Sequence, residues 1–141
     1  MDFLTSFKVT ASGLAAQRLR MNLIAENVAN ANTTRTPEGG PYRRRDALFV
    51  ARPFEELMDE QMAAGATGVV VDRVVKDTNP PRMQYDPSHP DANPEGYVQM
   101  PNIDPVMEMV NMMSASRTYE ANATVLNANK AMALKALELG R

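Results

Sequence analysis

The chain has 141 residues, 44% of them hydrophobic, and its 15 basic and 17 acidic side chains give a formal net charge of −2. This length is enough to bury a sizeable core as one unit, whereas the balanced charge excludes the broad basic surface of a nucleic-acid or membrane-surface binder. The absence of cysteine excludes a disulfide framework and cysteine-ligated metal sites, and no run of eighteen apolar residues predicts a membrane span.

The first segment, residues 1–36, predicts an N-terminal helical arm. Apolar and small residues recur there at steps of three and four, which is the spacing of one helix face. Asn30, Asn32 and Thr33 then replace helix formers, and Pro37 forbids continuation. The start of the chain lacks a basic region followed by an apolar run and a cleavage site, so we expect no cleaved signal peptide. The row consists of Phe3, Phe7, Thr10, Leu14, Gln17, Met21, Ile24, Val28 and Ala31.

Asn27 and Asn30 interrupt the apolar row of this helix. Asparagine is a weak helix former because its amide competes for backbone partners. On a packed seam it can instead fix the register and number of partners, at some cost in stability. Two readings therefore remain, a solvated surface residue and a register-setting residue of a helix interface.

The middle segment, residues 37–103, predicts a β-rich insert. All ten prolines lie between Pro37 and Pro105, which marks a turn-rich region. Ala47–Val50 and Val69–Val75 are β-branched or apolar enough to be strands, with Val69, Val71 and Val74 facing inward. Phe54–Ala64 could form a short helix, and Tyr85 and Tyr97 bracket the loop Asp86–Gly96.

An enzyme hypothesis would have to rest on Asp86, His89 and Asp91, which place ligand-type atoms within six residues. The loop offers no helix to fix their geometry, no third nitrogen or sulfur ligand and no nearby nucleophile. Gly39 and Gly40 do not form a phosphate loop, because no Lys-Ser or Lys-Thr pair follows them. We therefore expect no catalytic residues, no metal site and no cofactor.

The run Arg43, Arg44 and Arg45 beside Tyr42 allows three interpretations. Clustered cations and a ring can bind nucleic acid, but the run stands alone in an acidic insert and Asp46 follows it. A solvated or ion-paired turn fits better. The run could also meet an acidic patch on a neighbouring subunit, for which the chain offers Glu55, Glu56, Asp59 and Glu60.

The last segment, residues 104–141, predicts a C-terminal helical arm. Asp104–Leu139 contains no glycine or proline after Pro105 and carries two apolar rows, which fits either the core helix of a bundle or a coiled-coil-like assembly. The fold class is thus mainly α with a small β-rich insert, the long terminal helices pairing as a coiled-coil-like arm. One row is Met109, Met112, Ser116, Tyr119, Ala123, Leu126, Lys130, Ala133 and Leu137, and the second is Met107, Ser114, Ala121, Val125, Ala128, Met132 and Leu139.

Three stretches resemble the bacterial flagellar rod and hook proteins. Ser12–Thr33, with SGLAAQRLRMN followed by IAENVANANT, is similar to the N-terminal signature of that family. Gly96–Asp104, with GYVQMPNID, and Glu108–Asn122, with EMVNMMSASRTYEAN, are similar to the entry and first turns of its C-terminal helix. The resemblance covers the whole chain, and Phe54–Gly65 is the least family-like stretch.

The resemblance implies a structural subunit of the proximal rod of the flagellar basal body, exported without a cleaved signal through the flagellar type III export apparatus. It implies a periplasmic helical tube in which the terminal helices line the inner layer, transmit torque and form part of the export channel. The implied partners are other copies of the chain, other rod proteins and the hook-basal body adaptor at the membrane ring, with no nucleic acid and no membrane insertion. A soluble coiled-coil adaptor is the alternative. The expected assembly interface is Phe7, Leu14, Met21, Ile24, Asn27, Val28, Asn30, Met109, Met112, Met113, Tyr119, Ala123, Val125, Leu126 and Leu137.

Overall fold

A computed structural model describes residues 3–53 and 67–139 of the chain. The predicted short helix at Phe54–Ala64 lies outside the described residues. The elements, in chain order, are α1 (Phe3–Ala29), β1 (Arg45–Pro53), β2 (Thr67–Lys76), β3 (Arg82–Tyr85), β4 (Tyr97–Met100) and α2 (Pro105–Leu139). The predicted fold class, two long terminal helices flanking a small β region, is confirmed.

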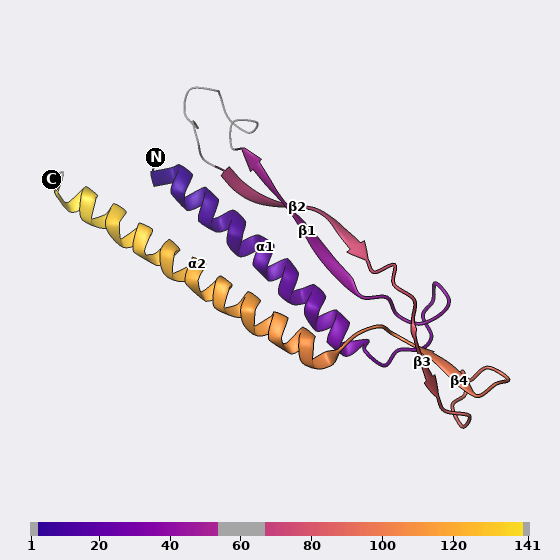
Figure 1. The fold of residues 1–141 in the computed structure, drawn as a ribbon. Coiled ribbons are helices and arrows are strands. Elements are labelled where there is room, and N and C mark those ends of the chain that lie inside the picture. Colours follow the sequence, from indigo (N-terminus) through magenta and orange to yellow (C-terminus); the bar gives the residue numbers. More distant parts are fainter. Residues whose placement is uncertain (1–2, 54–66, 140–141) are drawn as a thin grey trace.

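The molecule is elongated, and α1 forms its middle layer (Figure 1). The two helices run antiparallel, so both termini lie at the same end. The β1–β2 hairpin lies along α1 on the side away from α2, and the β3–β4 hairpin lies at the end opposite the termini. The insert is therefore split, because one hairpin extends the helix pair sideways and the other extends it lengthwise.

Helix α2 begins at a side-chain cap and continues for 35 residues, about 52 Å at 1.5 Å per residue. The Asp104 carboxylate accepts a hydrogen bond from the amide of Val106 at 2.9 Å, which satisfies a free donor of the first turn. Helix α1 ends in a turn in which the hydroxyl of Thr33 donates to the side-chain oxygen of Asn30 at 3.2 Å. The predicted arms, residues 1–36 and 104–141, each contain one of these helices, and their limits as domains stay a prediction.

Small residues let the two helices approach closely. Ala16 and Ala115 are buried, and Ala115 is fully shielded from solvent. A methyl group added at Gly13 would lie 3.2 Å from the amide nitrogen of Asn122, across the helix pair. Asn129 donates to the hydroxyl of Ser6 at 3.0 Å nearer the termini. The pair is therefore held by backbone proximity and short polar contacts as well as by large apolar side chains.

Both predicted strands form and pair antiparallel, with a bulge between Leu48 and Phe49. Val69, Val71 and Val74 pair with Ala51, Phe49 and Ala47, so they share one face of the hairpin. Val71 is half-buried, but Val69 and Val74 are 38% and 44% exposed. The prediction that all three point into a core is wrong, because a two-stranded hairpin beside a single helix cannot have a whole face covered.

The second hairpin confirms that Tyr85 and Tyr97 bracket a loop. Their rings meet edge to face with centroids 5.2 Å apart, in the last pair of the β3–β4 register. Gly96, just before β4, has a φ of +84°, where a side chain would be strained. Val98 on β4 and Ile103 after it are buried, so this hairpin is anchored at its base.

Candidate assembly surfaces

Asn27 is 1% exposed and forms the centre of a polar junction between three elements. Its amide nitrogen donates to the carbonyl of Arg45 at 2.8 Å and to the Glu108 carboxylate at 3.1 Å. Its oxygen accepts from the backbone amide of Arg45 at 2.9 Å and from the hydroxyl of Tyr42 at 3.3 Å. Asn27 on α1 thus serves as the backbone partner of the first residue of β1 and also contacts α2.

Glu108 is 2% exposed and supplies the buried charge of this junction. Its second oxygen accepts a hydrogen bond from Nε of Arg44 at 2.8 Å, and Arg44 also pairs with Asp46 at 3.0 Å. Burial alone would lower the pKa of Arg44, but hydrogen bonds to Glu108 and Asp46 outweigh it and raise that pKa. Glu108 therefore has a cationic partner inside the junction, as a buried carboxylate requires.

The two asparagines that the sequence singled out have different roles. Asn27 joins α1, β1 and α2, whereas the Asn30 side chain donates to the carbonyl of Glu26 one turn back and accepts from Thr33. Asn27 makes these contacts inside one chain. In this structure Asn27 connects the hairpin to the helix pair, and a register-setting role between chains stays a prediction.

The second apolar row of α2 is uncovered along the length of the helix. Val125 and Met132 are 48% and 61% exposed, and Met107 and Leu139 are exposed as well. The small members of the row, Ser114, Ala121 and Ala128, are also exposed. A helix face that is apolar and has no partner among residues 3–53 and 67–139 is suited to packing against another molecule.

The first row of α2 lies nearer α1 and is partly covered. The predicted interface residues divide accordingly: Ile24 and Asn27 are buried within the chain; Leu14, Met21, Asn30, Met112, Tyr119, Ala123 and Leu126 are half-buried; and Phe7, Val28, Met109, Met113, Val125 and Leu137 are exposed. The exposed group is available to another molecule, whereas the side chains of Ile24 and Asn27 are occupied by contacts within the chain. The interface itself stays a prediction.

Reasoning from the sequence missed Glu108, Arg44 and Asn129 as packing residues. In the sequence, Glu108 stood out only as the first residue of the family-like stretch Glu108–Asn122, and Arg44 as one of three clustered cations. A signal was present: Glu108 is the only acidic residue in the first turn of α2 and falls beside the apolar rows. Its partner could not be inferred, since Arg44 lies 64 residues away.

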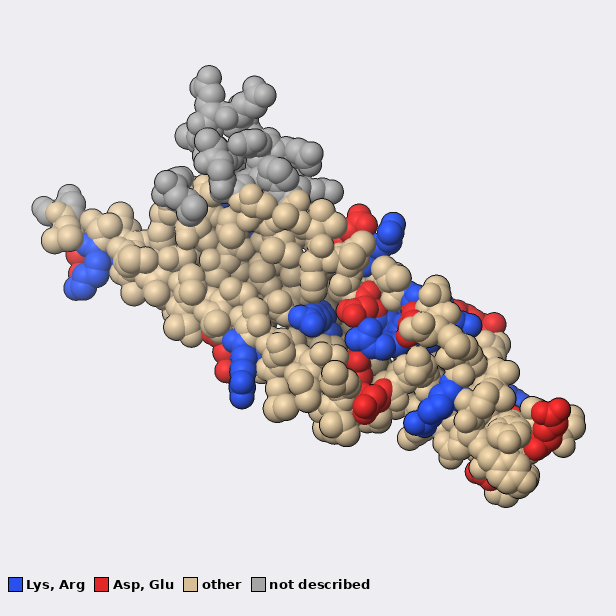
Figure 2. Space-filling model, viewed as in Figure 1, with Lys and Arg blue, Asp and Glu red and all other residues tan. Residues whose placement is uncertain are grey.

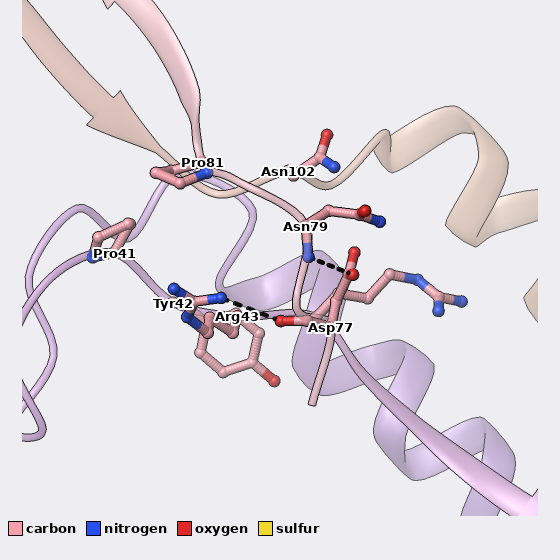
Figure 3. A pocket seen from close by; sticks show the side chains of 8 residues that line it. Pro41, Tyr42, Arg43, Asp77, Asn79, Pro81 and Asn102 are labelled. Atoms are coloured by element: carbon pink, nitrogen blue, oxygen red, sulfur yellow. Dashed lines mark hydrogen bonds between the residues drawn. The ribbon is translucent and has the colours of Figure 1, made fainter. Parts of the chain in front are cut away.

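On the face drawn in Figure 2, most charged side chains lie in the half that holds the start of β1 and the second hairpin. Figure 2 shows a largely uncharged surface over the part nearer the termini, while blue and red atoms cluster where β1 begins and around the second hairpin. A small cavity beside Arg43 and Asp77, shown in Figure 3, encloses about 20 Å³, room for a single water. Arg43 donates there to the backbone carbonyl of Asp77 at 3.2 Å.

The acidic loop around His89 makes ordinary turn contacts. Asp86 accepts hydrogen bonds from the amide and hydroxyl of Ser88, which lower the pKa of Asp86. Asp91 pairs with Arg35 at 2.6 Å, and Nδ1 of His89 accepts from the amide of Asp91 at 3.1 Å. Over residues 3–53 and 67–139 there is no cluster of three metal-ligating side chains, and neither helix there is long and apolar enough to cross a membrane.

Two family matches fall on the two helices. Residues 7–35 match the family described as flagella basal body rod protein, and residues 95–139 match the C-terminal region of the flagellar basal body rod FlgEFG proteins. The matched segments cover most of α1 and all of α2, the elements that form the pair. The fold and these matches define a structural protein of the flagellar rod.

Full-length relatives identify the family more closely. The chain is 43% identical to the flagellar basal-body rod protein FlgC of Borreliella burgdorferi, over 99% of this chain and 98% of the relative. It is also 43% identical to the FlgC proteins of Bacillus subtilis, over 96% and 97%, and Salmonella typhimurium, over the whole of both chains. The chain belongs to the FlgC family of flagellar basal-body rod proteins.

Proposed function

We propose that the chain polymerises through its terminal helices into the proximal part of the rod, as a periplasmic tube that transmits torque and surrounds the export channel. The observation that carries this proposal is the uncovered second row of α2. One chain covers one side of α2 with α1 and leaves apolar side chains such as Val125 and Met132 to solvent. Burying that face between subunits would stabilise the assembly in proportion to the apolar area removed from water.

The second row of α2 has a composition suited to an assembly in which a subunit makes slightly different contacts with each of its neighbours. Ala121 and Ala128 allow close helix approach, and the flexible side chains of Met107 and Met132 can adapt to different neighbours. The proposed partners are other copies of the chain, other rod proteins and the hook-basal body adaptor at the membrane ring. Export through the flagellar type III apparatus, without a cleaved signal, and a non-enzymatic role belong to the same proposal.

A charge placed on the uncovered face tests the proposal. Val125→Asp should leave the isolated chain folded, because Val125 is 48% exposed, but should abolish motility and recovery of the chain in purified basal bodies. The reason is that an unpaired carboxylate buried at an interface costs several kcal/mol. Circular dichroism of the purified variant and immunoblots of basal bodies from a complemented deletion strain measure the two effects.

Asn127→Asp is the matched control. It adds the same charge two residues away at an exposed position, about 200° around the helix from Val125. We expect Asn127→Asp cells to swim normally. Normal motility and basal-body recovery with Val125→Asp would refute the proposed use of this face.

A further inference from the structure

A basic pocket lies where the chain leaves α1 and enters the first hairpin. It measures about 540 Å³ and is lined from the turn at Thr33–Arg45 and from Lys76 at the end of β2. Tyr42, Thr36 and Asn30 add polar groups to its wall. The charged lining residues are Arg35, Arg43, Arg45, Lys76 and the single acid Glu38.

Two of these four cations have close carboxylate partners. Lys76 pairs with Glu38 at 2.5 Å, and Arg35 pairs with Asp91 at 2.6 Å. The hydrogen bond from Lys76 lowers the pKa of Glu38, which keeps that carboxylate ionised. These pairs neutralise one side of the pocket.

The other two cations are poorly neutralised. Arg43 donates to a backbone carbonyl, that of Asp77, which carries no net charge. Arg45 approaches Glu26 only to 3.8 Å, and its buried Nε has no hydrogen-bond partner among the described residues. The Arg45 backbone is fixed by Asn27, and its guanidinium lies 5.7 Å from the centre of the Tyr42 ring. Two held guanidinium groups with no carboxylate closer than 3.8 Å among the described residues favour an anionic ligand.

The same chain carries a complementary segment. Residues 54–66 contain four acids and no basic residue, namely Glu55, Glu56, Asp59 and Glu60. We propose that the basic pocket binds this acidic segment of a second copy of the chain. The proposal rests on the proposed function, since rod assembly is what would bring two copies side by side.

The first two acids of the segment, Glu55 and Glu56, are too close to Pro53 along the chain to meet the pocket of their own chain. It joins Pro53 to Thr67, whereas the pocket lies at Arg45 and Lys76, at the other end of the hairpin. Strand β1 spans about 26 Å at 3.3 Å per residue. Glu56 is three residues past Pro53, within about 11 Å at full extension, which falls short of the pocket even when a glutamate and an arginine side chain are added. Glu55 or Glu56 can therefore pair with Arg43 only when it comes from another molecule.

Binding of a synthetic peptide tests the contact directly. A labelled peptide with the sequence of residues 54–66 is titrated with the purified full chain, and fluorescence anisotropy reports binding. Arg43→Glu should weaken binding by about tenfold or more, because an attractive contact becomes a repulsive one. Arg73→Glu, on the same hairpin but outside the pocket lining, should change it by less than about twofold. Equal binding by Arg43→Glu and the wild type, or by a peptide with amides in place of the four acids, would overturn the proposal.

A charge exchange in cells identifies the second copy as the source of the acids. Arg43→Glu alone and Glu55→Lys with Glu56→Lys should each reduce recovery of the chain in basal bodies. A chain that carries all three changes should be recovered in basal bodies at a higher level than the Arg43→Glu chain or the chain with the two glutamate changes, because opposite charges meet again. A combination no better than its parents would show that the acids come from another protein and would overturn the proposal.

The outcomes separate this proposal from the role in the rod. If Arg43→Glu is recovered in basal bodies at the wild-type level while Val125→Asp is lost from them, the proposed pocket contact is refuted and the proposed role in the rod stands. If each variant is recovered at the wild-type level, the pocket contact and the proposed role of the α2 face are both refuted. Circular dichroism of Arg43→Glu should match the wild type, since this side chain is exposed.

Discussion

Replacing Asn27 with leucine should disconnect the first hairpin from the helix pair. Leucine branches at the same carbon as asparagine but can neither donate nor accept a hydrogen bond. The change therefore removes all four hydrogen bonds of the Asn27 side chain: two to the backbone of Arg45, one to Glu108 and one from Tyr42. Leucine is the larger residue, so the change leaves no cavity, and strain from its extra volume adds to the loss of the polar contacts.

The expected loss in the free energy of unfolding is about 3 kcal/mol. Each backbone bond to Arg45 contributes about 1 kcal/mol, and the bond to the buried Glu108 carboxylate about 1.5 kcal/mol. The Tyr42 hydroxyl is only partly buried and can turn to water, so its bond adds little. Water can also reach part of the freed Arg45 backbone, which keeps the total below the full penalty for buried unsatisfied groups.

Urea denaturation of the full chain, followed by circular dichroism and tyrosine fluorescence, measures this loss. Asn30→Ala is the matched control, because the Asn30 side chain makes only local bonds to Glu26 and Thr33 and should cost below about 1 kcal/mol. Equal losses in the two variants would refute the claim that Asn27 joins the three elements. Recovery in basal bodies provides a second measurement, and it should fall for Asn27→Leu alone.

Two further predictions concern the hairpins. Gly96→Ala should destabilise the β3–β4 hairpin by about 1–2 kcal/mol, because φ at this position is +84° and the new methyl would lie 2.9 Å from the Tyr85 ring. Faster hydrogen exchange of the Val98 amide would show this loss, and unchanged exchange would contradict the prediction. Lys76→Ala should raise the pKa of Glu38 toward its ordinary value, since Lys76 is the main cause of the lowered pKa, as an NMR titration of the carboxyl would detect. Because the folded-state pKa is the lowered one, the pair contributes stability above the ordinary glutamate pKa, and this is lost as the pH falls through the folded value. An unchanged Glu38 pKa in Lys76→Ala would contradict the assigned cause.

Much of the fold followed from local pattern. The steps of three and four in residues 3–31 and 104–139 predicted both long helices, because helical periodicity depends only on neighbouring residues. The cluster of prolines placed the β region, and β-branched runs located β1 and β2. Whether the side chains of Val69 and Val74 are buried could not be predicted in the same way, because burial in a hairpin depends on which element covers that face.

By itself, the sequence predicted two long helices, the second with two apolar rows, and its motifs pointed to the flagellar rod and hook family. Only the tertiary structure decided which surface is used within the chain and which remains free. Asn27, Arg44 and Glu108 are dispersed polar residues in the sequence, and they become one junction because folding brings together groups up to 81 residues apart. The basic pocket arises in the same way, since Arg43 and Lys76 meet only when β1 pairs with β2. Contacts between distant residues depend on chain path and register, which no local pattern specifies.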